Sequence, residues 1–123
     1  MKFKCEDLEV YNLSRELVVK IYQITNKLPQ SEKFGLRLQI RRSVTSISLN
    51  IAEGSGKSTN KDFANFIRIA IGSLIETDTS LKIAIDLKFI TKNDYAKIDK
   101  LIEKTYFKLI GLHKYLKNNN AKK

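Results

Sequence analysis

Residues 95–116 read YAKIDKLIEKTYFKLIGLHKYL, and the spacing of their core-type residues decides the fold class. Successive spacings are 3, 4, 3, 4, 3 and 4, at Tyr95, Ile98, Ile102, Thr105, Leu109, Leu112 and Leu116. This pattern is the heptad seam of one amphipathic helix, interrupted only by Thr105. Thr91 and Asp94 resemble a capping box, with Asp in place of the usual Glu or Gln. We therefore expect the helix to begin near Thr91 and to continue without a break.

Three earlier segments carry the same helical spacing of apolar residues. The first runs from about Asp7 to Leu28, because Pro29 disfavours a helical conformation at the residue before it. The second covers residues 36–51, and its apolar face is broad. The third covers residues 61–88, and no proline interrupts it. The sequence thus predicts four helices joined by short connections.

Glycines mark two features of these helices. Residues 52–56 end the second helix, where Gly54 or Gly56 is expected to adopt the left-handed cap conformation. Gly72 lies inside the third helix and costs about 1 kcal/mol relative to Ala, so it predicts a close approach between helices. With no strand alternation, we expect an all-α fold, an antiparallel up-down four-helix bundle. It should form a single domain over residues 1–117, followed by a disordered, polar basic tail at 118–123.

The charge balance is the unusual total of this chain. It has 123 residues with 23 Lys and Arg against 13 Asp and Glu, a net charge of +10. Residues 91–123 hold nine basic and three acidic residues, so this part carries most of the excess. Such a field attracts polyanions, either nucleic acid or an acidic protein surface.

The sequence offers little for catalysis. It has no phosphate-binding or dinucleotide-binding glycine motif and no paired-cysteine metal site. His113 is the only histidine, and we interpret it as a partly exposed helix residue. Cys5 is the only cysteine, and we expect a thiol without a catalytic role near a frayed end of the chain. We therefore expect no enzyme, no metal and no cofactor. The sequence has no apolar run long enough for a transmembrane helix, and its N-terminus lacks the apolar region of a secretory signal peptide. We therefore expect a cytoplasmic protein without a membrane partner.

Three groups of basic residues are candidate contacts for nucleic-acid phosphates. The first is a stripe of lysines that fall within about 80° of one another around the axis of the last helix. The centre of the stripe lies roughly 130° from the centre of the apolar seam, and we expect no acidic side chain to neutralise it. The second combines i,i+4 neighbours with an adjacent arginine, and the third flanks the start of the third helix. In order they are Lys97, Lys100, Lys104 and Lys108; Arg37, Arg41 and Arg42; and Lys57 and Lys61. Solvated faces, or internal pairing with Glu53 or Glu76, remain the alternative interpretation.

Several segments resemble a known family. They include the stretch Phe34-Gly35-Leu36 and the run from Ser48 to Gly54, and further on the run from Ala70 to Glu76. The shared motif residues are Asn50, Glu53, Gly54, Gly72, Ser73 and Glu76. Over almost the whole chain, this resembles the four-helix-bundle family of 23S ribosomal-RNA intervening-sequence proteins. We interpret Asn50, Glu53 and Gly54 as cap-and-loop structure, and a shared polar contact to a partner is the alternative.

The resemblance implies a cytoplasmic bacterial protein that assembles as a homopentamer around a central channel. The family is also similar to the accessory protein of diversity-generating retroelements, a basic barrel that binds nucleic acid and a reverse transcriptase. Broad apolar faces on the second and third helices agree with assembly, because a lone bundle would leave them exposed. The pentamer is an expectation from the resemblance, and the apolar faces give a physical reason for assembly.

Two functions stay open at this point. One is a non-enzymatic oligomeric protein that contacts RNA or DNA phosphates through its basic faces. The other is a protein-interaction scaffold, for example a reverse-transcriptase accessory protein, in which the charge serves solubility. An RNA-processing enzyme is the least supported interpretation, because no site can be drawn for it.

Overall fold

The structure, a computed structural model, describes residues 1–119 and contains only helices there. The expected all-α class is confirmed. Asn118 ends the last helix, and the predicted tail beyond Asn119 lies outside the described residues. The elements are η1 (Lys4–Asp7), α1 (Glu9–Thr25), η2 (Gln30–Glu32), α2 (Leu36–Ser55), α3 (Asn60–Asp86), α4 (Lys92–Ala96) and α5 (Asp99–Asn118).

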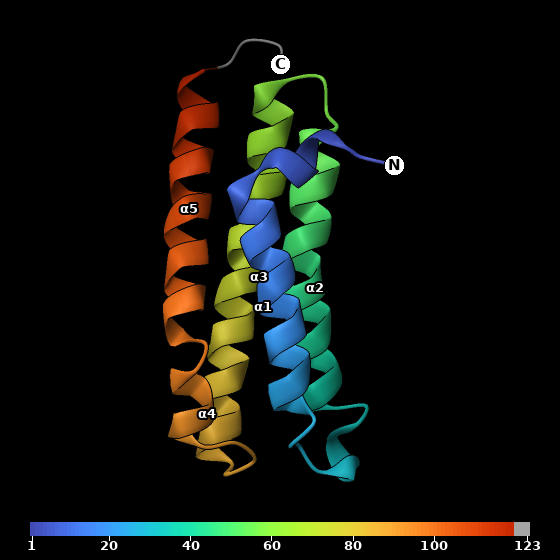
Figure 1. The fold of residues 1–123 in the computed structure, drawn as a ribbon, viewed down its shortest axis with the longest axis vertical. Helices are drawn as coiled ribbons and strands as arrows, with labels where there is room; N and C mark the ends of the chain where they lie inside the picture. Colours follow the sequence, from blue (N-terminus) through green and yellow to red (C-terminus); the bar gives the residue numbers. More distant parts are fainter. Residues whose placement is uncertain (120–123) are drawn as a thin grey trace.

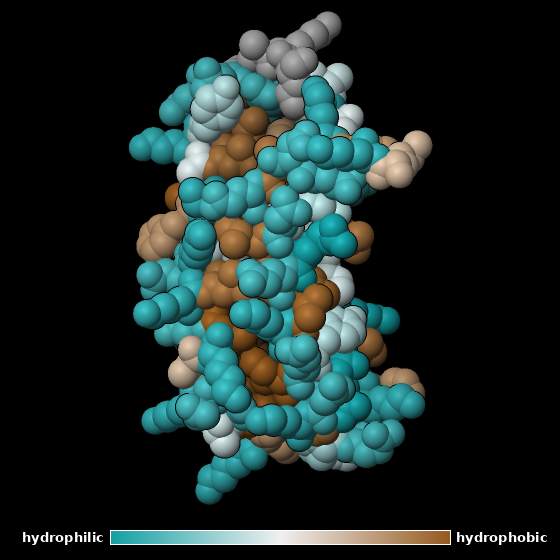
Figure 2. Space-filling model, in the orientation of Figure 1, coloured by the Kyte–Doolittle hydropathy of each residue, from teal (hydrophilic) through white to brown (hydrophobic). Residues whose placement is uncertain are grey.

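Four long helices pack side by side into an elongated bundle (Figure 1). The chain passes along the bundle in α1, returns in α2, passes again in α3 and returns in α5. α3 contacts both α2 and α5, and α1 packs against α2 and α5. Figure 2 shows hydrophilic side chains over most of one face, with hydrophobic ones visible along the long axis between α1 and α5. Among residues 1–119, no helix is both long enough and apolar enough to cross a membrane.

The predicted apolar stripes form the core. Its largest members are completely or almost completely shielded from solvent, and each such burial contributes about 1.5–3 kcal/mol. They include Leu17, Ile21, Ile40, Ile47, Ile51, Ile67, Leu74, Leu81, Ile98 and Leu109. Thr105, which interrupts the seam, is also buried, and its hydroxyl donates to the Leu101 carbonyl at 2.7 Å. The hydroxyl is thereby satisfied without a partner from another helix.

The prediction of one unbroken last helix is wrong. The backbone leaves the helix at Ile98 (φ −121°, ψ −8°), which separates α4 from α5. Ile98 itself is 1% exposed, and the Tyr95 hydroxyl on α4 donates to the Asp78 carboxylate on α3. The Tyr95–Asp78 hydrogen bond links α4 to α3. The heptad spacing did not reveal the break because the seam residues on both sides still face the bundle.

Asp94 anchors α4 to the end of α1. Its backbone N–H donates to Thr91 Oγ1 at 3.0 Å, and its carboxylate accepts from the Thr91 N–H at 2.9 Å. The predicted capping box is therefore confirmed, with Asp in the Glu position. The buried carboxylate also pairs with the Lys27 ammonium at 2.5 Å. The Lys27 hydrogen bond and then the Thr91 backbone lower the pKa of Asp94 to about 2, although burial opposes them.

Glycines play other roles than those expected. Gly54 lies inside α2, and Gly56 caps it in right-handed backbone geometry (φ −85°), so the left-handed cap is wrong. A Cβ on Gly54 would come within 2.7 Å of Phe66 Cβ and 2.8 Å of Phe63 Cδ1. Close helix approach therefore occurs at Gly54. Gly72 is exposed and a Cβ there would meet open space, so the close approach expected at Gly72 is also wrong.

The motif residue Asn50 belongs to helix packing as well. Its amide donates to the Ser46 carbonyl at 2.8 Å and to Ser46 Oγ at 2.9 Å. Ser73 Oγ on α3 donates to the same Ser46 hydroxyl at 3.0 Å. The Ser73–Ser46 hydrogen bond joins α3 to α2, and Asn50 lies within α2 and bonds to the same Ser46, which corrects the cap-and-loop interpretation of Asn50.

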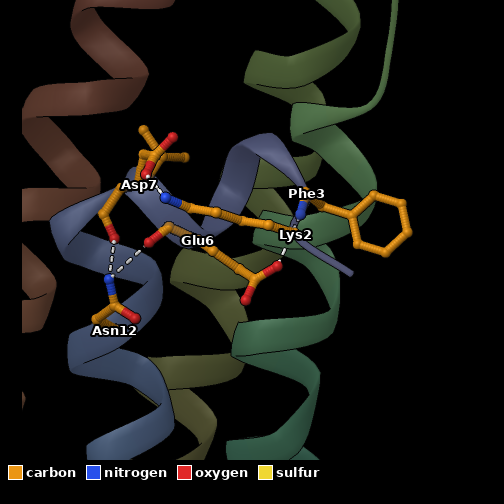
Figure 3. A network of polar contacts seen from close by, with 6 residues as sticks. Lys2, Phe3, Glu6, Asp7 and Asn12 are labelled. Carbon is orange, nitrogen blue, oxygen red and sulfur yellow. Dashed lines mark hydrogen bonds and ion pairs between the residues drawn. The ribbon is translucent and has the colours of Figure 1, made fainter.

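The N-terminal segment is held in place rather than frayed (Figure 3). Glu6 accepts from the Phe3 N–H at 2.7 Å, and Lys2 pairs with Asp7 at 2.8 Å. The Asn12 amide on α1 donates to the Glu6 carbonyl at 3.1 Å. Cys5, inside η1, is 3% exposed. The expectation of a thiol near a frayed end is therefore wrong.

The two glycines give a matched test of helix packing. Gly54→Ala should destabilise the protein by about 1–3 kcal/mol, because the new methyl group overlaps Phe63 and Phe66. Gly72→Ala should stabilise it by about 0.5–1 kcal/mol, because Ala loses less backbone entropy in a helix. Urea unfolding followed by far-UV circular dichroism measures both changes. A Gly54→Ala variant that is as stable as the wild type, or more stable, would contradict the packing role of Gly54.

Asp94 makes stability depend on pH. Because its folded pKa of about 2 lies below the ordinary 3.8, it stabilises the fold above pH 3.8, and this contribution disappears as pH falls toward 2. Asp94→Asn should cost about 1–3 kcal/mol at neutral pH and much less near pH 2. Unfolding midpoints at both pH values measure this, with the exposed Asp86→Asn as control. A loss that does not change with pH would refute the ionic contribution.

Candidate nucleic-acid interface

The arginine group does not form one outward face. Arg37 donates through Nη2 to the Leu28 carbonyl at 2.5 Å, and its Nε is buried. Arg41 donates to Thr25 Oγ1 at 3.0 Å and to Asn26 Oδ1 at 2.9 Å, at the end of α1. Both guanidinium groups therefore fasten α2 to the region where α1 ends. There a positive charge also opposes the negative end of the helix dipole.

Further contacts of Arg41 strengthen this assignment. Its Nη2 donates to the Tyr22 carbonyl at 3.2 Å, and its guanidinium carbon lies 4.4 Å from the centre of the Tyr22 ring. Arg42 differs, because it is exposed and lines a shallow surface hollow together with Glu76. Arg42 is thus the member of this group that an external ligand can reach, beside a carboxylate.

The lysine stripe is interrupted and partly neutralised. Lys97 lies at the end of α4, before the break, so it does not share the register of the other three lysines. Lys108 lies 3.5 Å and Lys104 3.9 Å from the Glu9 carboxylate on α1. The expectation of an unneutralised stripe is therefore wrong for these two, because the neighbouring helix α1 places a carboxylate beside them. Lys100 is exposed and makes no ion pair within residues 1–119.

Lys57 and Lys61 lie near the start of α3 but on different surfaces. The Lys57 ammonium lies 5.1 Å from the centre of the Phe66 ring, and Lys57 lines a hollow of about 770 Å³ with Phe3 and Glu53. Lys61 instead lines a groove of about 340 Å³ between α3 and α5. The structure therefore separates the pair that the sequence placed together.

The groove beside Lys61 contains residues that sequence reasoning did not select. Its lining is Lys61, Ala64, Asn65 and Arg68 from α3, with His113 and Lys117 from α5. No carboxylate lines this groove or lies within ion-pair distance of its basic groups in the described part of the chain. Burial first, and then Lys117 and Arg68, lower the pKa of His113 below 6.5. The groove is therefore a concave, positively charged surface.

Only the packing of α3 against α5 brings this set together. Within each helix the signal is weak: His113 and Lys117 are i,i+4 neighbours, and Lys61 and Arg68 are two turns apart. The sequence could have shown that each pair shares a helix face. It could not show that the two faces meet, because that requires the relative positions of the two helices.

Glu53 and Glu76 are both exposed, on α2 and α3. Within residues 1–119, no group of three His, Cys, Asp or Glu side chains gathers as metal ligands would. The basic surfaces offer hydrogen-bond donors and positive charge, which suit an anionic partner.

Comparison with known proteins agrees with the fold. No curated protein matches the chain significantly. A solved structure of a protein of unknown function from the S23 ribosomal protein family of Bacteroides thetaiotaomicron VPI-5482 is similar to it. The two are 31% identical with a TM-score of 0.78, and the similarity covers 85% of this chain and 98% of the other. Residues 6–111 match the 23S rRNA-intervening sequence protein family, so this chain belongs to that family.

Proposed function

We propose that this protein is a non-enzymatic, oligomeric nucleic-acid-binding protein of the cytoplasm, which contacts phosphates through its basic surface. Family membership supports a role connected with ribosomal RNA. The proposed subunit is an antiparallel up-down bundle, and the path of the chain in Figure 1 supports it. The proposed assembly is a homopentamer.

One observation carries the nucleic-acid proposal: most of the positive charge is not used inside the subunit. Among residues 1–119, only six basic side chains lie within ion-pair distance of a carboxylate. These are Lys2, Lys20, Lys27, Lys82, Lys104 and Lys108. The net charge of +10 already subtracts every carboxylate, so these pairs do not reduce it. The excess charge therefore remains available to a polyanion.

Exposed apolar side chains support assembly. Leu49 on α2 is 66% exposed, and Ile69, Ile75 and Ile83 on α3 are 45%, 52% and 44% exposed. Large apolar side chains on neighbouring helices usually mark a surface that another protein covers. The solvent-facing Gly72 lies between Ile69 and Ile75 in the sequence and leaves room for a second surface to approach.

The nucleic-acid proposal is tested by fluorescence anisotropy with a labelled single-stranded RNA of about 20 nucleotides. At about 50 mM salt, the protein should bind, and the logarithm of its affinity should fall linearly with the logarithm of salt concentration. Each phosphate contact contributes about −0.7 to that slope. Absence of binding at about 50 mM salt would rule the proposal out.

Light scattering coupled to size exclusion tests the assembly. The expected mass is about five times 14.2 kDa. Replacing two exposed apolar residues, as in Ile69→Ser with Ile75→Ser, should lower the mass toward that of one subunit, because the covered apolar area is lost. Val19→Ser, a change of an exposed residue on α1, is the control. A monomeric wild-type protein at micromolar concentration would remove the pentamer.

A further inference from the structure

The groove between α3 and α5 is built by two rigid helices. Lys61, Asn65 and Arg68 come from the first three turns of α3, and His113 and Lys117 from the last two turns of α5. At this end of the bundle, where α3 begins and α5 ends, the Asn60 amide donates to the Asn119 carbonyl at 2.6 Å. The floor includes Ala64, which is 5% exposed. These contacts fix the spacing between the two sets of basic side chains.

Its charge differs from that of the neighbouring basic surface. On α5, Lys104 and Lys108 lie near the Glu9 carboxylate, which reduces their field. In the groove, Lys61, Arg68 and Lys117 have no such partner among residues 1–119. A concave wall of low dielectric concentrates the field of like charges. Within the described chain, this groove therefore differs from the Lys104 and Lys108 surface, because it is concave and its charge is not neutralised by a carboxylate.

Its hydrogen-bond donors suit phosphate oxygens. Arg68 offers a planar fork that can hold two oxygens of one phosphate, and Lys61 and Lys117 offer ammonium groups. The Asn65 amide adds a neutral donor. Lys61 and Arg68 are seven residues apart, about 10 Å along the helix axis. A nucleic-acid strand carries a phosphate on every nucleotide, so it can supply an acceptor to each of them.

We propose that this groove is a binding site for the phosphate backbone of RNA, and that His113 adds a contact that depends on its protonation. This inference rests on the proposed nucleic-acid function and assigns that function to one surface. The site holds about three phosphates, which Lys61, Arg68 and Lys117 contact directly.

The charges around His113 set the direction of its response to pH. Lys61 and Arg68 from α3 and Lys117 from α5 share its groove, and all three are positive. Burial, Lys117 and Arg68 lower the pKa of His113 in the empty groove. A bound phosphate supplies negative charge and reverses this effect, so RNA binding and proton uptake strengthen each other. A phosphodiester keeps its charge near neutral pH, so affinity should rise as pH falls from about 8 to about 6.

The experiment compares two triple variants with equal changes in net charge. The groove variant is Lys61→Gln, Arg68→Gln and Lys117→Gln, and the matched control on α5 is Lys100→Gln, Lys104→Gln and Lys108→Gln. All six residues are exposed, so both variants should fold, and circular dichroism verifies this. RNA affinity is measured by anisotropy with the single-stranded RNA at about 50 mM salt and at higher salt.

The groove variant should lose about tenfold or more in affinity, and its salt slope should decrease by about 2, the value for three lost contacts. The control should lose less than about threefold. Wild type should bind several times more tightly at about pH 6 than at about pH 8, whereas His113→Gln should show little change.

Other outcomes would overturn the groove, the proposed function or the protonation contact of His113. Equal losses in the two variants would show that the net charge, and not the groove, governs binding, which overturns this inference but leaves the proposed function intact. Wild-type protein that fails to bind RNA would overturn both. A polyglutamate chain of matched charge that competes as well as RNA would assign the groove to an acidic protein partner. A pH response that persists in His113→Gln would remove the protonation contact.

Discussion

α3 packs against α2 along one side and against α5 along another, and this double contact organises the whole bundle. Ile67, Leu74 and Leu81 are buried along its length, so displacing either neighbour would expose part of this seam. Between α2 and α3 the contact is close because side chains are small or absent. Gly54 admits Phe63 and Phe66, and hydroxyl pairs such as Ser43 with Thr77, at 2.8 Å, replace larger groups.

This packing decides which charged groups can bind a partner. Arg37 and Arg41 lie where α2 meets the end of α1, and they donate to backbone and side-chain oxygens there. Their charge stabilises the fold and is not presented to solvent as one patch. Lys104 and Lys108 lie beside Glu9 because α5 runs next to α1. A net charge by itself therefore overstates the positive surface that an anion can reach.

The α3–α5 contact has the opposite effect. It brings Arg68 toward His113 and Lys117 with no carboxylate in the groove that they line, and burial together with both cations lowers the pKa of His113. Like charges brought together in this way cost free energy in the isolated subunit. A surface that carries such a cost without an internal partner is well placed to bind an anion, since the anion relieves the repulsion. The same contact that completes the core thus forms the basic groove that we propose as an anion site.

The sequence by itself determined the helices, because periodic apolar residues must be buried on one face of each. The core positions of α1, α2, α3 and α5 and the Thr91–Asp94 capping box follow from that local pattern and from backbone hydrogen bonding. Family membership was also readable, in the motif residues around Asn50 and Ser73. The break at Ile98 was not, since the seam has the same spacing with or without it. Only the tertiary structure decided the roles of Gly54, Arg41, Lys104 and His113. Each role depends on a side chain from another helix, and spacing along one helix carries no information about which helix lies opposite.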